Sequence, residues 1–512
     1  MFPIAVSRIQ AWVAGRPLAA AIVCLVIGAI TTLSFAPFGY WFLAPLAAAA
    51  MMLVFFVAEP KLSARLGFAY GVGVFLSGTY WIYVSVHVFG QAPLAVALLL
   101  MFGLVLIMAT YLGFIGWALS TLSAGRPWQM ALVAPALWAF VEWLRGWALS
   151  GFPWLSFGYG QIDSPLAGWA PVIGIYGVSW MLLVSAAAIV PLMAAPRAGR
   201  SAVLLLAMPW LTGALLQQET WTEAEGEAVE TTIVQGGVPQ DRKWLRQQFV
   251  PTLNLYRDAL LDAEDSDLVV WPEVAIPAIS NQVEDYLSLL ERDIRRRRQT
   301  LALGILEPHS NGLQVYNSVF MLDGAERQAY RKRHLVPFGE YFPVPDFVRE
   351  WMRLLALPNT DMQKGADRQP LLTTAQGVSV AAAICYEDAY GAEQLYAFPE
   401  AAMIVNVSND AWFGESIAPY QHLQVAQMRA LEVERPVIRA TNNGISAFID
   451  HRGQVTDVAP QFELATLTRS VQPRGGLTPY AATGNPPLLI LLIAIVLVPW
   501  LLDRRHQSNS VN

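Results

Sequence analysis

The pattern of apolar and polar positions divides the chain into two parts of different character. From Pro17 to Gln218, long apolar runs are broken only by short stretches rich in Gly and Pro and by nine charged residues. A helix that crosses a membrane needs about 20 apolar residues. The pattern therefore predicts eight membrane-spanning helices: two within Pro17–Ala58, two within Leu66–Gly125, and one each at about Pro127–Leu149, within Ser164–Pro196, at Ser201–Gln218 and at about Pro487–Leu502. A cleaved signal peptide is a weaker interpretation of the first run, because that run continues directly into the second.

A second pattern extends from Glu219 to Arg474. Short β-branched runs alternate there with helical periodicity, which is typical of an α/β fold with layered sheets and helices. The expected strands are Glu230–Val234, Asp267–Trp271, Leu301–Ile305, Val315–Met321, Val378–Ile384, Ala402–Val407, Val437–Ala440 and Ala447–Ile449, and the expected helices are Asp241–Ala263, Gln282–Arg298 and Tyr420–Glu434. In such folds, functional residues gather just beyond the carboxyl ends of strands.

Composition strengthens this division. Hydrophobic residues make up 55% of the 512 residues and charged residues only 14%, whereas a soluble chain carries about 25% charged residues. Because most charges fall in the second part, we expect a membrane bundle at 1–218, one water-soluble domain at 219–484, and an eighth helix with a short tail at 485–512. The net charge of −6 gives no basic signal, so a nucleic-acid partner is not indicated.

The basic residues also predict an orientation, because short cytoplasmic loops of membrane proteins are rich in Lys and Arg. With the N-terminus in the cytoplasm, every short basic cluster falls on the cytoplasmic side: Arg8 and Arg16, Lys61 and Arg65, Arg126, Arg197 and Arg200, and Arg504 and Arg505. Seven spans then place the soluble domain on the opposite side of the membrane, outside the cytoplasm.

Two features of the apolar part carry polar or aromatic groups. Glu142 and Arg145 stand three residues apart in the fifth span, on one helical face. They form either a structural ion pair or part of a substrate entrance, since charges inside a membrane often mark functional sites. The segment Gly151–Gly160 is aromatic and rich in Gly. It is either an interfacial belt or a loop that contacts lipid.

Three chemically useful side chains follow β-structure in the soluble part. Glu273 comes after a strand stopped by Pro272, Lys332 lies in a basic loop, and Cys385 follows a run of small apolar residues. A thiolate attacks acyl carbons, a carboxylate can accept the thiol proton, and an ammonium can stabilise the oxyanion that develops. Cys24 is the only other cysteine, and without a CxxC motif or a Cys/His cluster a structural zinc site is not expected.

Each of these residues also has an ordinary explanation. A single cysteine after a strand is often a small core residue, and Glu273 alone could be a solvated loop carboxylate. Lys332 belongs to the basic run Arg331–His334, which by itself suggests a solvated or lipid-facing patch. The combination favours a nucleophilic site, and its chemistry does not require His334.

The motifs that hold these residues resemble a known family. WPE at Trp271–Glu273, YRKRHLVPFGEY at Tyr330–Tyr341 and CYED at Cys385–Asp388 resemble the nitrilase, or carbon–nitrogen hydrolase, superfamily with its Glu-Lys-Cys triad. The apolar part, GFPWLSFGYG at Gly151–Gly160 and SNDAWFG at Ser408–Gly414 narrow the resemblance to the bacterial apolipoprotein N-acyltransferases. The resemblance covers nearly the whole chain.

This resemblance implies a fold, a reaction and a set of residues. The fold would be an αββα sandwich on a bundle of eight transmembrane helices in the bacterial inner membrane. The reaction would move an acyl chain from a phospholipid to the amine of an S-diacylglyceryl apolipoprotein, through a thioester and without metal or cofactor. The matching residues are Cys385 as nucleophile, Glu273 as base, Lys332 at the oxyanion, and the supporting residues Glu340, Tyr386, Glu387 and Trp244.

Some alternatives stay open at this stage. A membrane-tethered amidase would use the same triad with water as acceptor, and a transporter with an external binding domain would need more intramembrane charges. We expect a monomer. The segment Phe342–Gln369 is long and irregular, with Phe347, Trp351 and Leu355 at helical spacing. It either packs onto the domain in the ordinary way or, as we hypothesise, forms a mobile amphipathic lid that touches the bilayer.

Overall fold

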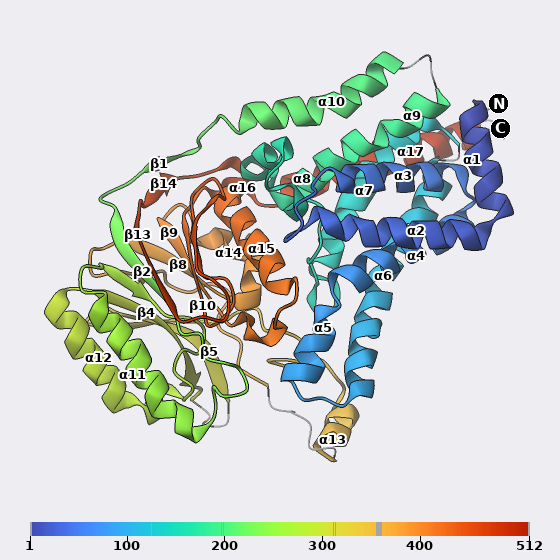
Figure 1. Cartoon of the computed structure of the whole chain (residues 1–512). Coiled ribbons are helices and arrows are strands. Elements are labelled where there is room, and N and C mark those ends of the chain that lie inside the picture. Colours follow the sequence, from blue (N-terminus) through green and yellow to red (C-terminus); the bar gives the residue numbers. More distant parts are fainter. Residues whose placement is uncertain are drawn as a thin grey trace. The chain divides into compact units, whose positions relative to one another are not determined.

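The chain forms two compact units in the computed structural model, which describes residues 3–123, 125–195, 197, 199–310, 312, 314–354 and 361–509. The first unit comprises Met1–Thr220, Glu415–Gln424 and Ala482–Asn512. The second comprises Trp221–Gly414 and Val425–Ala481. The first is helical and the second holds the β-sheets (Figure 1).

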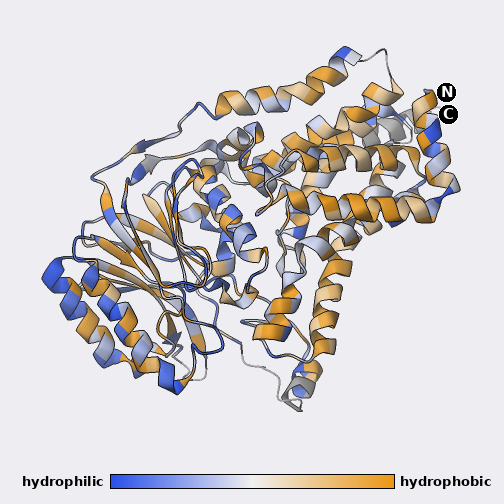
Figure 2. Ribbon diagram, in the orientation of Figure 1, coloured by the Kyte–Doolittle hydropathy of each residue, from blue (hydrophilic) through white to orange (hydrophobic). Residues whose placement is uncertain are grey.

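The first unit consists of apolar helices. They are α1 Ile4–Gly15, α2 Pro17–Thr31, α3 Leu43–Val57, α4 Pro60–Gly78, α5 Trp81–Tyr83, a π-helix at Val84–Phe89, α6 Leu94–Ser123, α7 Pro127–Arg145, α8 Ala170–Ala187, α9 Ile189–Ala194, α10 Gly199–Leu216 and α17 Pro486–Asn509. Leu18, Leu99 and Ile490 are at least 69% exposed, and Figure 2 draws much of these helices in orange, the colour of hydrophobic residues. Such outward apolar side chains are typical of helices that lie in lipid.

Length and hydropathy qualify four helical stretches among the described residues to cross a membrane. They are Pro17–Ser34, Leu94–Ser123, Pro165–Ala194 and Gly199–Leu216. A fifth candidate is α4 together with Trp81–Phe89, which are bent by 49°. The apolar helices at Leu43–Val57 and Pro486–Val498 are shorter. The structure therefore supports a membrane part of four to five spans by these criteria, fewer than the eight expected.

Glycines allow two of these helices to pack backbone to backbone. A β-carbon on Gly28 of α2 would overlap the carbonyl of Tyr70 in α4, and one on Gly73 would overlap the carbonyl of Leu25. Small residues at such contacts are how helices approach closely in membranes, where water does not drive them together.

The charged pair of the fifth expected span binds the aromatic loop that follows it. Arg145 donates hydrogen bonds from Nη1 to the carbonyl oxygens of Phe152 at 2.7 Å and Trp154 at 2.6 Å. Glu142 accepts one from the backbone N–H of Phe157 at 3.3 Å. Both charged side chains are buried. These contacts favour the structural interpretation of the pair, because its groups are engaged in holding the loop.

The second unit contains two six-stranded sheets. One has the order β13-β2-β3-β4-β5-β6 and the other β12-β11-β10-β9-β8-β7. Their strands are β2 Val229–Gln235, β3 Leu268–Val270, β4 Thr300–Pro308, β5 Val315–Leu322, β6 Arg327–Arg331, β7 Leu372–Thr373, β8 Ser379–Ile384, β9 Met403–Ser408, β10 Val437–Thr441, β11 Ala447–Ile449, β12 Val455–Val458 and β13 Ala465–Val471; β1 Thr222–Ala224 pairs with β14 Arg474–Gly476.

All eight expected strands are present, and the unexpected ones in these two sheets are informative. The strands β6, β7, β12 and β13 occupy the four sheet edges. Edge strands carry polar and charged side chains, as the alternating exposure of β12 and β13 shows. They therefore lack the apolar runs by which the central strands were identified.

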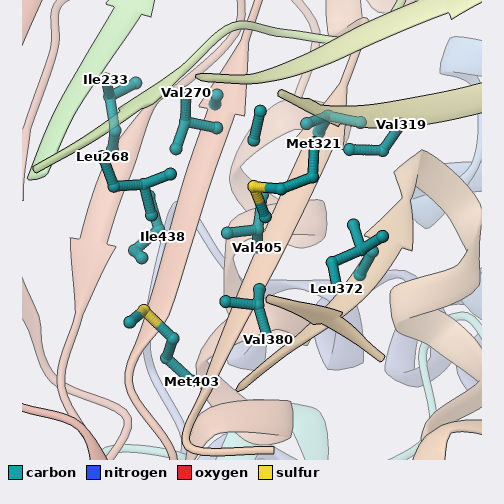
Figure 3. Packing of buried hydrophobic residues seen from close by; sticks show 14 of the residues in the cluster. Ile233, Leu268, Val270, Val319, Met321, Leu372, Val380, Met403, Val405 and Ile438 are labelled. Carbon is teal, nitrogen blue, oxygen red and sulfur yellow. The ribbon is translucent and has the colours of Figure 1, made fainter. Parts of the chain in front are cut away.

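The two sheets face each other across an apolar core. Figure 3 shows Ile233, Leu268 and Val270 of one sheet against Val405 and Ile438 of the other, all fully buried. A second cluster packs α11 Arg246–Asp262 and α12 Glu284–Arg297 on the outer face of the first sheet. Beside the second sheet lie α14 Gly391–Gln394 and α15 Ala418–Val433 (Figure 1). This is the expected helix–sheet–sheet–helix order.

Candidate active site

The three candidate residues each follow the end of a strand. Glu273 comes three residues after β3, while Lys332 and Cys385 directly follow β6 and β8. The first two belong to one sheet and Cys385 to the sheet facing it. The sandwich therefore brings the carboxylate, the ammonium and the thiol together at one end of its core.

Lys332 lies between two carboxylates. Its Nζ is 2.8 Å from Oε1 of Glu340 and 3.8 Å from Oε1 of Glu273. Only 1% of the Lys332 side chain, 9% of Glu273 and 11% of Glu340 are exposed. This burial excludes the solvated positions considered for Glu273 and Lys332. A buried ammonium loses its hydration, and the two carboxylates offset that loss.

Asn317 of β5 links the same two carboxylates. Its Nδ2 donates to Oε1 of Glu273 at 2.6 Å and to Oε1 of Glu340 at 3.1 Å. The backbone N–H of Val336 donates to Oε2 of Glu340 at 2.8 Å. Both carboxylate oxygens of Glu340 are therefore held, and Glu340 aligns Lys332. The contacts of Glu273 with Asn317 and Lys332 both use its Oε1.

The charges around Lys332 keep it protonated. Burial alone lowers the pKa of an ammonium, but the carboxylates of Glu340 and Glu273 and the nearby Cys385 raise the pKa of Lys332 well above its usual value. The side chain is therefore a permanent positive charge across the physiological pH range. This is the property needed by a group that stabilises an oxyanion.

Cys385 is a thiol in its resting form. Burial and the negative charge of Glu273 raise the pKa of Cys385 well above its usual value, and Lys332 only partly opposes them. Its backbone has a φ of 53°, in the left-handed region that non-glycine residues seldom adopt and that is concentrated at functional sites. A thiol of this kind needs an adjacent base before it can attack.

Glu387 ties the turn that begins at Cys385 to the loop that begins at Lys332. One carboxylate oxygen accepts from the backbone N–H of Ile384 at 2.8 Å, and the other accepts from the N–H of Arg333 at 2.7 Å. The hydroxyl of Tyr330 donates to it at 3.0 Å. Burial raises the pKa of Glu387, which these hydrogen bonds partly offset. Glu387 is therefore a positioning residue that fixes the chain on both sides of the site.

The other two expected supporting residues lie apart from this group. Tyr386 is half-buried and packs edge-on against Tyr390, with ring centroids 5.1 Å apart, and against His334 at 6.0 Å. Trp244 is 55% exposed. Its neighbour Lys243 points inward and donates from Nζ to the backbone carbonyl of Glu273 at 3.2 Å. Burial lowers the pKa of Lys243 to about 8.

Sequence reasoning did not single out Asn317 or Lys243. A signal exists for Asn317, because an amide side chain stands within an otherwise apolar strand, and a buried polar group usually has a specific partner. Lys243 has no such signal, since basic residues in loops are usually solvated. Only the three-dimensional structure shows that it reaches Glu273.

The comparisons with known proteins match the chain in two consecutive regions. Residues 27–188 match the profile of the apolipoprotein N-acyltransferase N-terminal domain, and residues 230–480 match that of carbon-nitrogen hydrolases. An apolipoprotein N-acyltransferase of Methylococcus capsulatus is 40% identical over 96% of this chain and 97% of that protein. One from Photobacterium profundum is 38% identical over 94% and 95%.

Among solved structures, an amidase of the nitrilase superfamily from Nesterenkonia is similar. It is 18% identical, with a TM-score of 0.37, and the match covers 52% of this chain and 97% of the amidase.

Proposed function

The chain belongs to the apolipoprotein N-acyltransferase family, and we propose that it transfers an acyl chain from a membrane phospholipid to the amine of an S-diacylglyceryl cysteine at the N-terminus of an apolipoprotein. The near full-length relatives support the transfer reaction, and the buried Glu–Lys–Cys group supports its chemistry. The reaction would be the last step of lipoprotein maturation.

The proposed reaction has two halves. In the first, Glu273 takes the thiol proton and the Cys385 sulfur attacks the phospholipid ester carbon. Lys332 stabilises the oxyanion, and the proton passes to the departing lysophospholipid hydroxyl. In the second, the lipoprotein amine attacks the thioester, and Glu273 takes the proton that the amine loses. The sulfur leaves and regains a proton, so that the resting thiol is restored.

The observation that carries this proposal is the placement of Lys332. Its buried ammonium stands within 3.8 Å of Glu273, and its charge acts on the Cys385 thiol. A structural lysine would be satisfied by one carboxylate, whereas this one has a second carboxylate partner and a thiol in its surroundings. Fixed charge aimed at a reacting carbonyl is usually the largest contribution to such catalysis.

The use of sulfur suits acyl transfer to an amine. A thioester is more reactive toward an amine than an oxygen ester, so a cysteine both accepts the acyl group and keeps it reactive for the acceptor. A membrane-tethered amidase with the same residues would pass the group to water instead. The two reactions therefore differ in the fate of one intermediate.

The proposed setting is the bacterial inner membrane, with the catalytic domain in the periplasm. The apolar helices at 1–218 and 485–512 would supply eight spans, and residues 219–484 would form the catalytic domain. The eight spans would be the five candidates identified by length and hydropathy together with the helices α3, α7 and α17. We expect the enzyme to act as a monomer, with phospholipid and lipoprotein as its partners and no cofactor.

The test uses the full-length protein in phospholipid vesicles with a diacylglyceryl peptide. The product expected is an amide on the peptide amine, with lysophospholipid in equal amount. Cys385→Ala should abolish both products, whereas Cys24→Ala, which alters the other cysteine, should change neither. Release of free fatty acid in place of the amide would contradict the proposal and favour the amidase.

A further inference from the structure

A buried polar cluster lies beside Cys385 on the side of the neighbouring strand. In the parallel pairing of β8 with β9, Ile384 is opposite Val407. The next residues, Cys385 and Ser408, therefore lie side by side at the carboxyl ends of their strands. Ser408 is fully buried, so its hydroxyl must find its partners inside the protein.

The Ser408 hydroxyl has two neighbours that can accept a hydrogen bond from it. It donates to Oδ1 of Asp410 at 2.9 Å. It is also within hydrogen-bonding reach of the Cys385 sulfur, and this contact lowers the pKa of the thiol. A hydroxyl carries one hydrogen and rotates to suit its surroundings. It therefore donates to the carboxylate or to the sulfur, but not to both at once.

Arg439 holds the far side of this cluster. It donates from Nη2 to Oδ2 of Asp410 at 2.9 Å, and from Nη1 to Oδ1 of Asn406 at 2.6 Å and Oδ2 of Asp388 at 3.3 Å. Both Arg439 and Asp410 are buried. Asp388 belongs to the turn that begins at Cys385. One guanidinium thus fixes Asp410 and the nucleophile turn, and Asp410 keeps this anchor when Ser408 turns away.

We propose that Ser408 and Asp410 form a positioning pair for Cys385, in which the Ser408 hydroxyl turns its hydrogen bond from the Asp410 carboxylate to the sulfur when the thiol ionises. In the resting state, the thiol S–H donates to Ser408 Oγ and the Ser408 O–H donates to Asp410. When Glu273 takes the thiol proton, Ser408 rotates and donates to the thiolate. Ser408 gains and loses no proton. This inference rests on the proposed role of Cys385 as nucleophile.

The two members of the pair act on the sulfur in opposite directions. Glu273, Lys332 and Asp410 are charged groups that act on Cys385. Like that of Glu273, the negative charge of Asp410 raises the pKa of the thiol, whereas the hydrogen bond from Ser408 lowers it. A pair with a merely structural role would show no such opposition when its members are changed one at a time.

The test is the pH dependence of Cys385 alkylation by iodoacetamide, followed by mass spectrometry of the peptide that contains Cys385. Ser408→Ala removes the donor to the thiolate, so the midpoint should move to higher pH and the rate at neutral pH should fall about tenfold. Asp410→Asn removes the negative charge, and its amide N–H can hold Ser408 Oγ. The midpoint should then move to lower pH and the neutral rate should rise by roughly tenfold.

A matched control is Ser266→Ala, because Ser266 is another buried serine, bonded to Thr232 at 2.7 Å in the opposite sheet. It should leave the midpoint unchanged. An unmoved midpoint in Ser408→Ala would overturn the pairing, and this result stands even if Asp410→Asn fails to fold. Shifts of both variants in the same direction would also overturn it.

Alkylation needs no lipid, so this measurement is independent of the proposed reaction. If wild-type Cys385 accepts an acyl chain but neither midpoint moves, the positioning pair is wrong and the proposed function stands. If the midpoints move as expected but no acyl chain reaches Cys385, the proposed function fails instead.

Discussion

At the scale of single residues, the site depends on the protonation states that burial and neighbouring charges give to Lys332 and Cys385. Lys332 keeps its proton because two carboxylates surround it, and Cys385 keeps its proton because burial and Glu273 disfavour the thiolate. The site therefore rests as acid, base and thiol rather than as a preformed thiolate.

Replacement of Lys332 tests its role at the oxyanion. Lys332→Met should lower the acylation rate by about 10²–10³, as the loss of one oxyanion donor does in other enzymes. The rate is measured as lysophospholipid release in a single turnover. Lys364→Met is the matched control, because Lys364 is 55% exposed and its ion pair is with the exposed Asp367. Similar rates in the two variants would contradict the role.

Asn317 offers a second test at this scale. Asn317→Ala removes the donor shared by Glu273 and Glu340, so both carboxylates lose a hydrogen bond worth about 1.5–3 kcal/mol for a charged acceptor. Glu273 should then be less well placed to accept the thiol proton. We expect kcat to fall at least tenfold with little change in KM. A rise in KM alone would mean that Asn317 contacts substrate instead.

At the scale of elements, Glu387 joins the turn that begins at Cys385 to the loop that begins at Lys332. Glu387→Gln replaces one acceptor oxygen by an N–H that faces backbone donors. The variant should lose both activity and several degrees of thermal stability, because a buried group is left unpaired. Full stability with lost activity would point to a direct chemical role for Glu387.

The expected lid, Phe342–Gln369, contains a short helix and an exposed aromatic side chain. Helix α13 Asp346–Leu354 lies in it, while Leu355 is outside the described residues. Its Phe347 is 77% exposed, and the segment returns to the site where the N–H of Gly365 donates to the carbonyl of Lys332 at 2.8 Å. We expect this exposed aromatic ring to contact the interface of the bilayer, where aromatic side chains are enriched.

Phe347→Ser tests this contact. Acyl transfer from vesicles should slow severalfold while thermal stability is kept, because the side chain contributes little to packing. Transfer from a short-chain donor dissolved in water should be unaffected. The prediction fails if both donors react at the wild-type rate, or if the variant unfolds.

The central elements of the fold were predictable from sequence, and the reason is physical. Buried strands such as β8 and β9 are largely apolar, and Cys385 directly follows the end of β8. The edge strands were not predictable, because their polar exposed faces resemble loops. The contact of Asn317 with Glu273 was not predictable, since it joins side chains 44 residues apart in the chain.

At the scale of the whole molecule, we expect the catalytic unit to face the periplasm. The loop near Gln314 lies in that unit. A reporter inserted there that is active only in the cytoplasm should be silent, and one active only in the periplasm should give a signal. The reverse result would mean that the number of spans before Glu219 is even rather than odd.

The most direct test of the central claim is the intact mass of the purified enzyme after exposure to a phospholipid of known acyl chains. One acyl chain should accumulate on Cys385 when no lipoprotein is present. A diacylglyceryl peptide with a free amine should discharge it, and the same peptide with a blocked amine should not. An acyl chain on a different residue, or discharge to water as fast as to the amine, would contradict the account.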